Sequence, residues 1–156
     1  MTFSLTSEAF TDGESIPARF TCDGEDVSPS LKWQGWPDGT ESFALIMDDP
    51  DAPSGTFTHW LIYDVNAQAR ALPEGVEKTE RPANSEGGMQ GKNDFGDIGY
   101  GGPCPPGGDA HHYNFRLYAL DSHVDLDPGA SKDELLKAMG GHILGETTLT
   151  GTYKRR

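Results

Sequence analysis

The chain has 156 residues, of which 35% are hydrophobic, and its formal net charge is −13 at pH 7. This length predicts one domain, and the 20 glycines and 11 prolines favour a turn-rich protein over a helical bundle. The negative charge repels phosphate backbones and anionic bilayers, which argues against nucleic acid and against stable membrane association.

Four short runs rich in aromatic and β-branched residues, bounded by Gly, Pro or Asp, are typical of strands. They lie at residues 42–47, 58–65, 112–120 and near 144–153. Before the last run, Ser131 and Glu134 form a capping-box pattern and Gly140 provides a stop signal, which predicts one short helix. The expected fold is mainly β, with at most one or two short helices.

A long polar segment, residues 78–108, separates the second and third predicted strands and is full of Gly, Pro and Asn. Loops of this length are uncommon in compact domains and are usually functional or disordered. We therefore expect a functional site to border this segment.

Strand alternation indicates which histidines can point toward the protein core. In the run 110–119, His111 and Tyr113 share the apolar face, whereas His112 points the other way. His59 begins the run 58–65 and shares a face with Leu61 and Tyr63. Two inward histidines, each at a strand end beside an unusual loop, predict a polar pocket.

Two proline-rich turns carry further candidate site residues. In the run 49–53, Pro50 and Pro53 stiffen a turn that carries Asp49 and Asp51. In the run 103–106, Cys104 supplies the only backbone N–H among three prolines. The second turn is either a rigid donor for an anion or simply a stiff connection.

These segments together resemble the phosphatidylethanolamine-binding protein family, also called Raf kinase inhibitor-like proteins. The resemblance runs through the whole chain in order, and the form Tyr-Gly-Gly-Pro-Cys-Pro-Pro at 100–106 is similar to the bacterial and archaeal branch. The matching segments are residues 16–17, 21–24, 28–33, 49–53, 58–60, 100–106, 111–113 and 151–153.

The resemblance implies two mostly antiparallel sheets in a sandwich-like arrangement, with a small pocket at one end. It implies a ligand such as phosphate or phosphorylethanolamine, and pairing of two copies into a homodimer. Carried over by motif, the ligand-binding residues are Asp49, Asp51, His59, Cys104 through its N–H, Pro106, His111 and Tyr113.

The presence of two aspartates in an anion pocket has to be explained, because a bare carboxylate repels a phosphate. We expect the carboxylates to fix the tautomer and orientation of histidines, whose N–H groups then meet the ligand with the Tyr113 hydroxyl. A protonated aspartate could also donate to the ligand. Binding should then strengthen below about pH 6.5, where an unperturbed histidine gains its proton.

Three other interpretations stay open. A Cys104 thiol beside His111 would suit a small hydrolase-like enzyme, although no nucleophile-elbow motif is present. The aspartates and histidines of the pocket are suitable metal ligands, but their spacing matches no known motif. The third is an interaction module, since some relatives inhibit kinases or proteases. We expect a binding protein without catalytic residues, metal or cofactor, whose pocket could regulate such a partner.

The remaining features concern the compartment and the cysteines. Residues 1–8 lack the basic and apolar regions of a signal peptide, and no stretch has transmembrane length. A cytoplasmic location is expected, or a periplasmic one if a signal peptide has been removed. Cys22 and Cys104 cannot make a disulfide framework, and the sequence leaves open whether they are reduced or paired.

Overall fold

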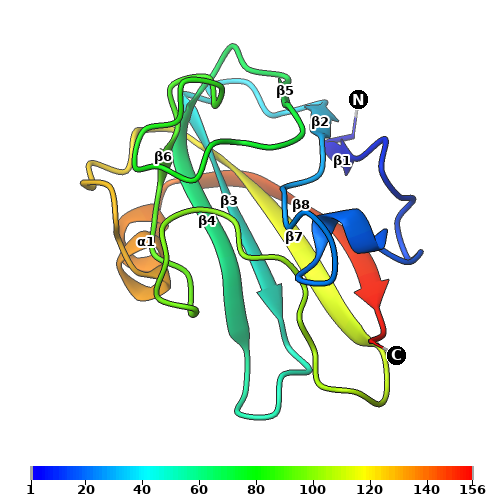
Figure 1. The fold of residues 1–156 in the computed structure, drawn as a ribbon. Coiled ribbons are helices and arrows are strands. Elements are labelled where there is room, and N and C mark those ends of the chain that lie inside the picture. The colour runs from blue at the N-terminus through cyan, green and yellow to red at the C-terminus, as the bar shows by residue number, and fades with distance from the viewer. Residues whose placement is uncertain (1, 156) are drawn as a thin grey trace.

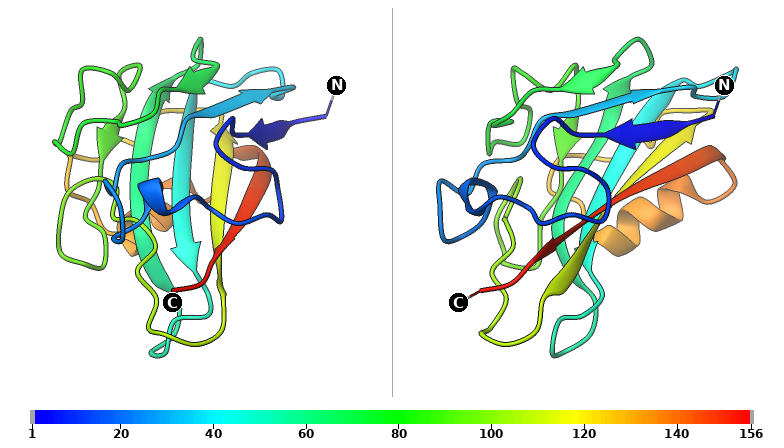
Figure 2. Two further views of the ribbon diagram at one scale, coloured as in Figure 1. Left: turned by 45° about the vertical axis from the view of Figure 1, so that its right-hand side comes forward. Right: turned by 90° about the vertical axis from the view of Figure 1, so that its right-hand side faces the viewer.

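In the computed structural model, which describes residues 2–155, two antiparallel sheets face each other and one helix covers the outer face of the larger sheet (Figures 1 and 2). The strand order is β6-β4-β3-β7-β8 in the larger sheet and β1-β2-β5 in the smaller one. The expected mainly β, two-sheet fold is therefore confirmed.

The larger sheet contains β3 (Ser42–Asp49), β4 (Phe57–Asn66), β6 (Met89–Gln90), β7 (His111–Leu120) and β8 (Ile143–Tyr153). The smaller sheet contains β1 (Ser4–Thr6), β2 (Leu31–Gln34) and β5 (Ala71–Leu72).

The predicted helix is α1 (Lys132–Met139), and its capping box is formed. The Ser131 side chain accepts from the Glu134 N–H at 3.2 Å, and the Ser131 N–H donates to Glu134 Oε1 at 3.1 Å. A 3₁₀ turn, η1 (Ala18–Phe20), precedes β2. Within residues 2–155 no helix is long and apolar enough to cross a membrane.

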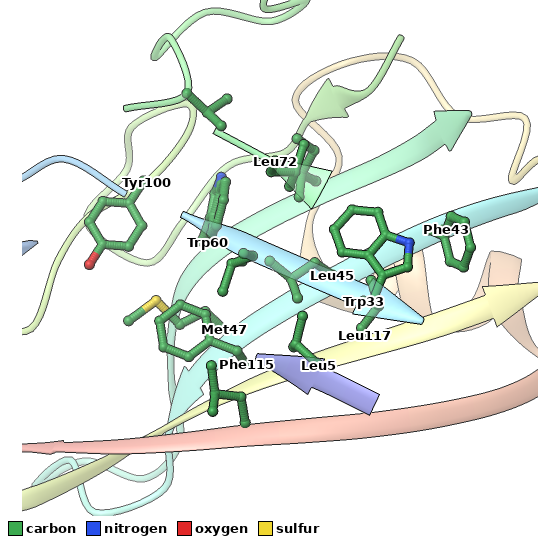
Figure 3. Packing of buried hydrophobic residues seen from close by; sticks show 14 of the residues in the cluster. Leu5, Trp33, Phe43, Leu45, Met47, Trp60, Leu72, Tyr100, Phe115 and Leu117 are labelled. Atoms are coloured by element: carbon green, nitrogen blue, oxygen red, sulfur yellow. The ribbon is translucent and has the colours of Figure 1, made fainter. Parts of the chain in front are cut away.

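Two apolar layers explain why β3 is buried along its whole length. Between the sheets, Leu5 and Trp33 of the smaller sheet pack with Phe43 and Phe115 of the larger one (Figure 3). On the other face, the fully buried Leu135 and its neighbours from α1 pack on β3 and β4. Both faces of the central strands are thus covered, and these strands hold the site residues at their ends.

The long segment 78–108 contains little regular structure, but Gln90 fixes its beginning. The buried Gln90 side chain donates through Nε2 to the carbonyls of Glu77 (2.7 Å) and Thr79 (2.8 Å). Its Oε1 accepts from the Trp60 indole N–H at 2.6 Å. The segment is therefore anchored to β4 rather than loose on the surface.

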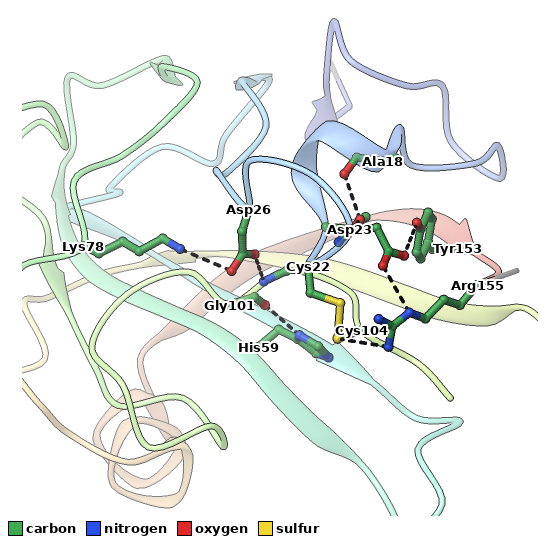
Figure 4. Close-up of a disulfide and its surroundings, with 12 residues drawn as sticks. Ala18, Cys22, Asp23, Asp26, His59, Lys78, Gly101, Cys104, Tyr153 and Arg155 are labelled. Carbon is green, nitrogen blue, oxygen red and sulfur yellow. Dashed lines mark hydrogen bonds and ion pairs between the residues drawn. A yellow bond between two sulfur atoms is a disulfide. The ribbon is translucent and has the colours of Figure 1, made fainter. Parts of the chain in front are cut away.

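A disulfide joins Cys22 and Cys104 across 82 residues (Figure 4). Beside it, the Cys22 N–H donates to the Pro103 carbonyl at 3.1 Å, and the Gly102 N–H donates to Asp26 Oδ1 at 2.7 Å. The pairing that the sequence left open thus ties the Pro-rich loop before β7 to the segment after η1.

Candidate functional site

A cavity of about 260 Å³ opens where β3 ends and where β4 and β7 begin, closed on one side by the Pro-rich loop. Six of the seven residues predicted from the sequence line it. They are Asp49, His59, Cys104, Pro106, His111 and Tyr113. The seventh, Asp51, does not belong to the lining.

His111 and Asp49 form a buried pair in the wall. The His111 Nδ1–H donates to Asp49 Oδ2 at 2.7 Å, and their side chains are only 12% and 4% exposed. The other Asp49 oxygen accepts from the Asp51 N–H at 2.8 Å. Both carboxylate oxygens are therefore engaged by protein donors, and the bond to Nδ1 fixes which ring nitrogen of His111 remains for a ligand.

Asp51 lies outside the lining and binds the outward-facing histidine instead. Its Oδ2 accepts from both the backbone N–H (2.8 Å) and the ring Nδ1–H (2.7 Å) of His112. The ring hydrogen bond, followed by the backbone one, lowers the pKa of Asp51. Asp51 thus stays ionised and fastens the turn to β7, and its contact with the ligand stays a prediction.

His59 reaches the cavity because β4 contains an extra residue at that point. Met47 pairs with Trp60 and Asp48 pairs with Thr58, so His59 has no partner of its own on β3. Simple alternation would place His59 with Leu61 and Tyr63, which pack toward α1. A bulge re-aims a side chain, and here it turns His59 to the opposite face, beside Tyr113 at a centroid distance of 5.2 Å.

The protonation of His59 follows from its surroundings. The ring is 3% exposed, and its Nδ1–H donates to the Gly101 carbonyl at 2.7 Å (Figure 4). Burial lowers the pKa of His59, and the Gly101 carbonyl and the charge of Asp49 oppose this only in part. His59 is therefore neutral at pH 7, with its proton on Nδ1 and a lone pair on Nε2.

Tyr113 carries a buried hydroxyl without a partner. Within residues 2–155 two buried side-chain oxygens make no hydrogen bond, Tyr113 Oη and Asp48 Oδ1. Asp48 lies on the other face of the sheet, where its second oxygen pairs with Lys132 at 3.2 Å, so Tyr113 is the one that lines the cavity. Burial and then the nearby carboxylates raise the pKa of Tyr113, so the hydroxyl keeps its proton and can donate.

The sequence did not identify the aromatic rim of the cavity. Phe57, Phe95 and Ser54 complete the lining together with Ala52, Pro53 and Pro105, which belong to the two turns already noted. The Phe95 ring lies 4.8 Å from that of Phe57 and 5.4 Å from that of His59, both at steep angles. Phe95 and Tyr100 are the two aromatic residues of the polar segment 78–108, and this was the only sequence signal for Phe95.

Larger hollows occur elsewhere on the surface, including one of about 900 Å³ beside Asp23 and Arg155. That hollow is also lined by Lys154, and its Arg155 is already paired with Asp23 at 3.1 Å. Over the described part of the chain, no group of three or more His, Cys, Asp or Glu residues is arranged to hold a metal ion. What distinguishes the cavity around Tyr113 is a buried hydroxyl that makes no hydrogen bond.

Known proteins match this chain over almost its full length. A family model described as phosphatidylethanolamine-binding protein matches residues 6–154. A UPF0098 protein of Methanothermobacter thermautotrophicus is 52% identical over 97% of this chain and 99% of its own length. One from Aquifex aeolicus is 50% identical over 96% of this chain and 86% of its own length.

Solved structures agree with these sequence matches. YbcL of Escherichia coli, described as a new member of the mammalian PEBP family, is 34% identical, with a TM-score of 0.90 and complete coverage of both chains. A phosphatidylethanolamine-binding protein homolog of Chlamydia trachomatis is 37% identical, with a TM-score of 0.89 over 99% of each chain.

Proposed function

This chain belongs to the phosphatidylethanolamine-binding protein family, and on that basis we propose that it is a binding protein whose cavity takes a small oxyanion of the phosphate type, such as phosphate or phosphorylethanolamine. The observation that carries the proposal is the buried Tyr113 hydroxyl, which lacks any partner and lines the cavity. A buried unpaired polar group costs stability, and a ligand oxygen would satisfy it.

The remaining contacts come from groups that the protein leaves unengaged. His59 and His111 each use Nδ1 within the protein, so each presents Nε2 as the second ring nitrogen. The Cys104 N–H makes no hydrogen bond within residues 2–155. Since both oxygens of Asp49 are occupied by protein donors, the ligand meets the Tyr113 O–H and the Cys104 N–H rather than a bare carboxylate, and Nε2 of His59 donates to it once that ring is protonated.

The structure gives less support to catalysis by Cys104. Nucleophilic attack requires a free thiolate, and in the structure this sulfur is bonded to Cys22. We therefore propose binding without chemistry, with Asp49 acting as the residue that orients His111.

Tyr113→Phe is expected to separate binding from stability. Removing the unpartnered hydroxyl should weaken phosphate binding about tenfold while leaving stability unchanged or raising it by about 1 kcal/mol. Calorimetric titration and urea unfolding measure the two effects. A variant that loses stability and keeps its affinity would show that the hydroxyl serves the fold.

Tyr100→Phe is the matched control. Tyr100 is equally buried, but its hydroxyl donates to the Phe20 carbonyl at 2.6 Å. This variant should lose about 1 kcal/mol of stability and bind phosphate as the wild type does.

Anion affinity is expected to rise as the pH falls. Free His59 has a pKa below the usual 6.5 because it is buried, whereas an anion beside Nε2 favours the protonated ring and raises that pKa in the complex. Between the two pKa values the complex holds more protons than the free protein, so acidification strengthens binding by at most about tenfold per pH unit. The increase should continue below pH 6.5 and level off beneath the pKa of free His59.

Calorimetry between pH 5 and 8, in two buffers of different ionisation enthalpy, measures this proton uptake. Sulfate serves as a tetrahedral ligand whose own charge is constant in this range. The His59→Gln variant keeps a donor near Gly101 but cannot titrate, so its sulfate affinity should vary less with pH. Flat wild-type affinity for both anions would contradict the role given to His59.

A further inference from the structure

Resting on the proposed function, we propose that Phe95 selects the organic part of the ligand, and that the preferred ligand is an oxyanion carrying an aromatic ring, such as an aryl phosphate, rather than free phosphate. The polar floor of the cavity would hold the anion, and Phe95 with Phe57 would hold the ring at the mouth.

The size and lining of the cavity support a ligand larger than phosphate. A volume of about 260 Å³ corresponds to roughly nine water molecules, more than a five-atom oxyanion fills. Besides the polar groups already described and Ser54, the lining is apolar and comes from Ala52, Pro53, Phe57, Phe95, Pro105 and Pro106.

Phe95 is exposed and yet held in place. Its side chain is 46% exposed, while its backbone N–H donates to Oδ1 of the buried Asn93 at 3.0 Å. The neighbouring Asp94 ties the turn to β4, because its Oδ2 accepts from the Thr58 N–H at 2.7 Å. The ring also lies so close to Gly101 that a Cβ there would be 2.5 Å from Phe95 Cδ2. A fixed ring loses little conformational freedom when a ligand packs on it.

The charge around the cavity also favours a ligand with an aromatic ring. Within residues 2–155 the cavity lining includes no lysine or arginine, and the chain carries a net charge of −13. In the cavity, a free phosphate would be held against this background by hydrogen bonds and by the charge of a protonated histidine. A ligand that also buries an aromatic ring gains affinity that does not depend on charge, and an edge-to-face contact with Phe95 would extend the existing series of rings formed by His59, Phe57 and Phe95.

The test is calorimetric titration of the wild type and of Phe95→Ala with phenyl phosphate, ethyl phosphate and inorganic phosphate. We expect the wild type to bind phenyl phosphate about tenfold more tightly than ethyl phosphate. Phe95→Ala should remove this preference, so that the ratio of the phenyl phosphate affinity to the ethyl phosphate affinity falls to about one. Leu136→Ala, which removes a similarly exposed apolar side chain from α1 (41% exposed), should leave all three affinities unchanged.

The outcomes separate this inference from the function on which it rests. If the wild type binds none of the three ligands, both proposals fail. If it binds all three equally, or if Phe95→Ala keeps the preference for phenyl phosphate, the anion site stands and the role of Phe95 is wrong. If ethanolamine phosphate binds more tightly than phenyl phosphate and Phe95→Ala removes that advantage, the mouth selects a cation instead of an aromatic ring, which also overturns the inference. Thermal unfolding of Phe95→Ala checks that the variant is folded.

Discussion

Replacing both Cys22 and Cys104 by serine is expected to lower the free energy of unfolding by about 4 kcal/mol. The disulfide closes a loop of 82 residues, and a cross-link over so long a loop removes much of the conformational entropy of the unfolded chain. The loss is a large fraction of the stability of an ordinary domain. Urea unfolding of the oxidised wild type and of the double variant measures the difference.

The effect of a reducing agent provides the control. A dithiol such as dithiothreitol should bring the wild type to the stability of the double variant, and it should leave the double variant itself unchanged. Since Cys104 also lines the cavity, phosphate affinity should fall together with stability. A wild type that is indifferent to reduction would show that the two cysteines are not paired in solution.

The central elements could be predicted because their sequence patterns are strong. The long strands β3, β4 and β7 have continuous or alternating apolar runs, and β8 is rich in threonine. The capping box at Ser131 is a local pattern that needs no tertiary information. The strands β1, β2, β5 and β6 have only two to four residues, too few for a periodic pattern to show. The pairing of Cys22 with Cys104 is likewise a tertiary fact, since the chain path that brings them together has no local signal.

The face on which a site residue lies could be predicted where strand alternation holds, but not where a bulge interrupts it. Alternation on β7 correctly separated His111, in the cavity wall, from the exposed His112. On β4 the sequence named a residue that lines the cavity but gave it the wrong face, because the extra residue that turns His59 inward depends on pairing with β3. The position of Asp51 likewise depends on tertiary pairing. Two carboxylates in one turn look equivalent in sequence, and only their partners on β7, His111 and His112, distinguish them.

Gln90→Leu is expected to destabilise the protein by about 3 kcal/mol or more. Leucine keeps most of the buried volume, but it leaves the buried Trp60 indole N–H without a partner, which costs about 1–3 kcal/mol. It also removes two hydrogen bonds to the carbonyls of the exposed residues Glu77 and Thr79, each worth about 0.5–1.5 kcal/mol. Gln68→Leu, at an exposed position, should change stability by less than about 0.5 kcal/mol. Because Trp60 directly follows His59, the Gln90 variant should also bind phosphate more weakly at temperatures where it is fully folded. Unchanged stability and affinity in Gln90→Leu would mean that the long loop is held to β4 by other contacts.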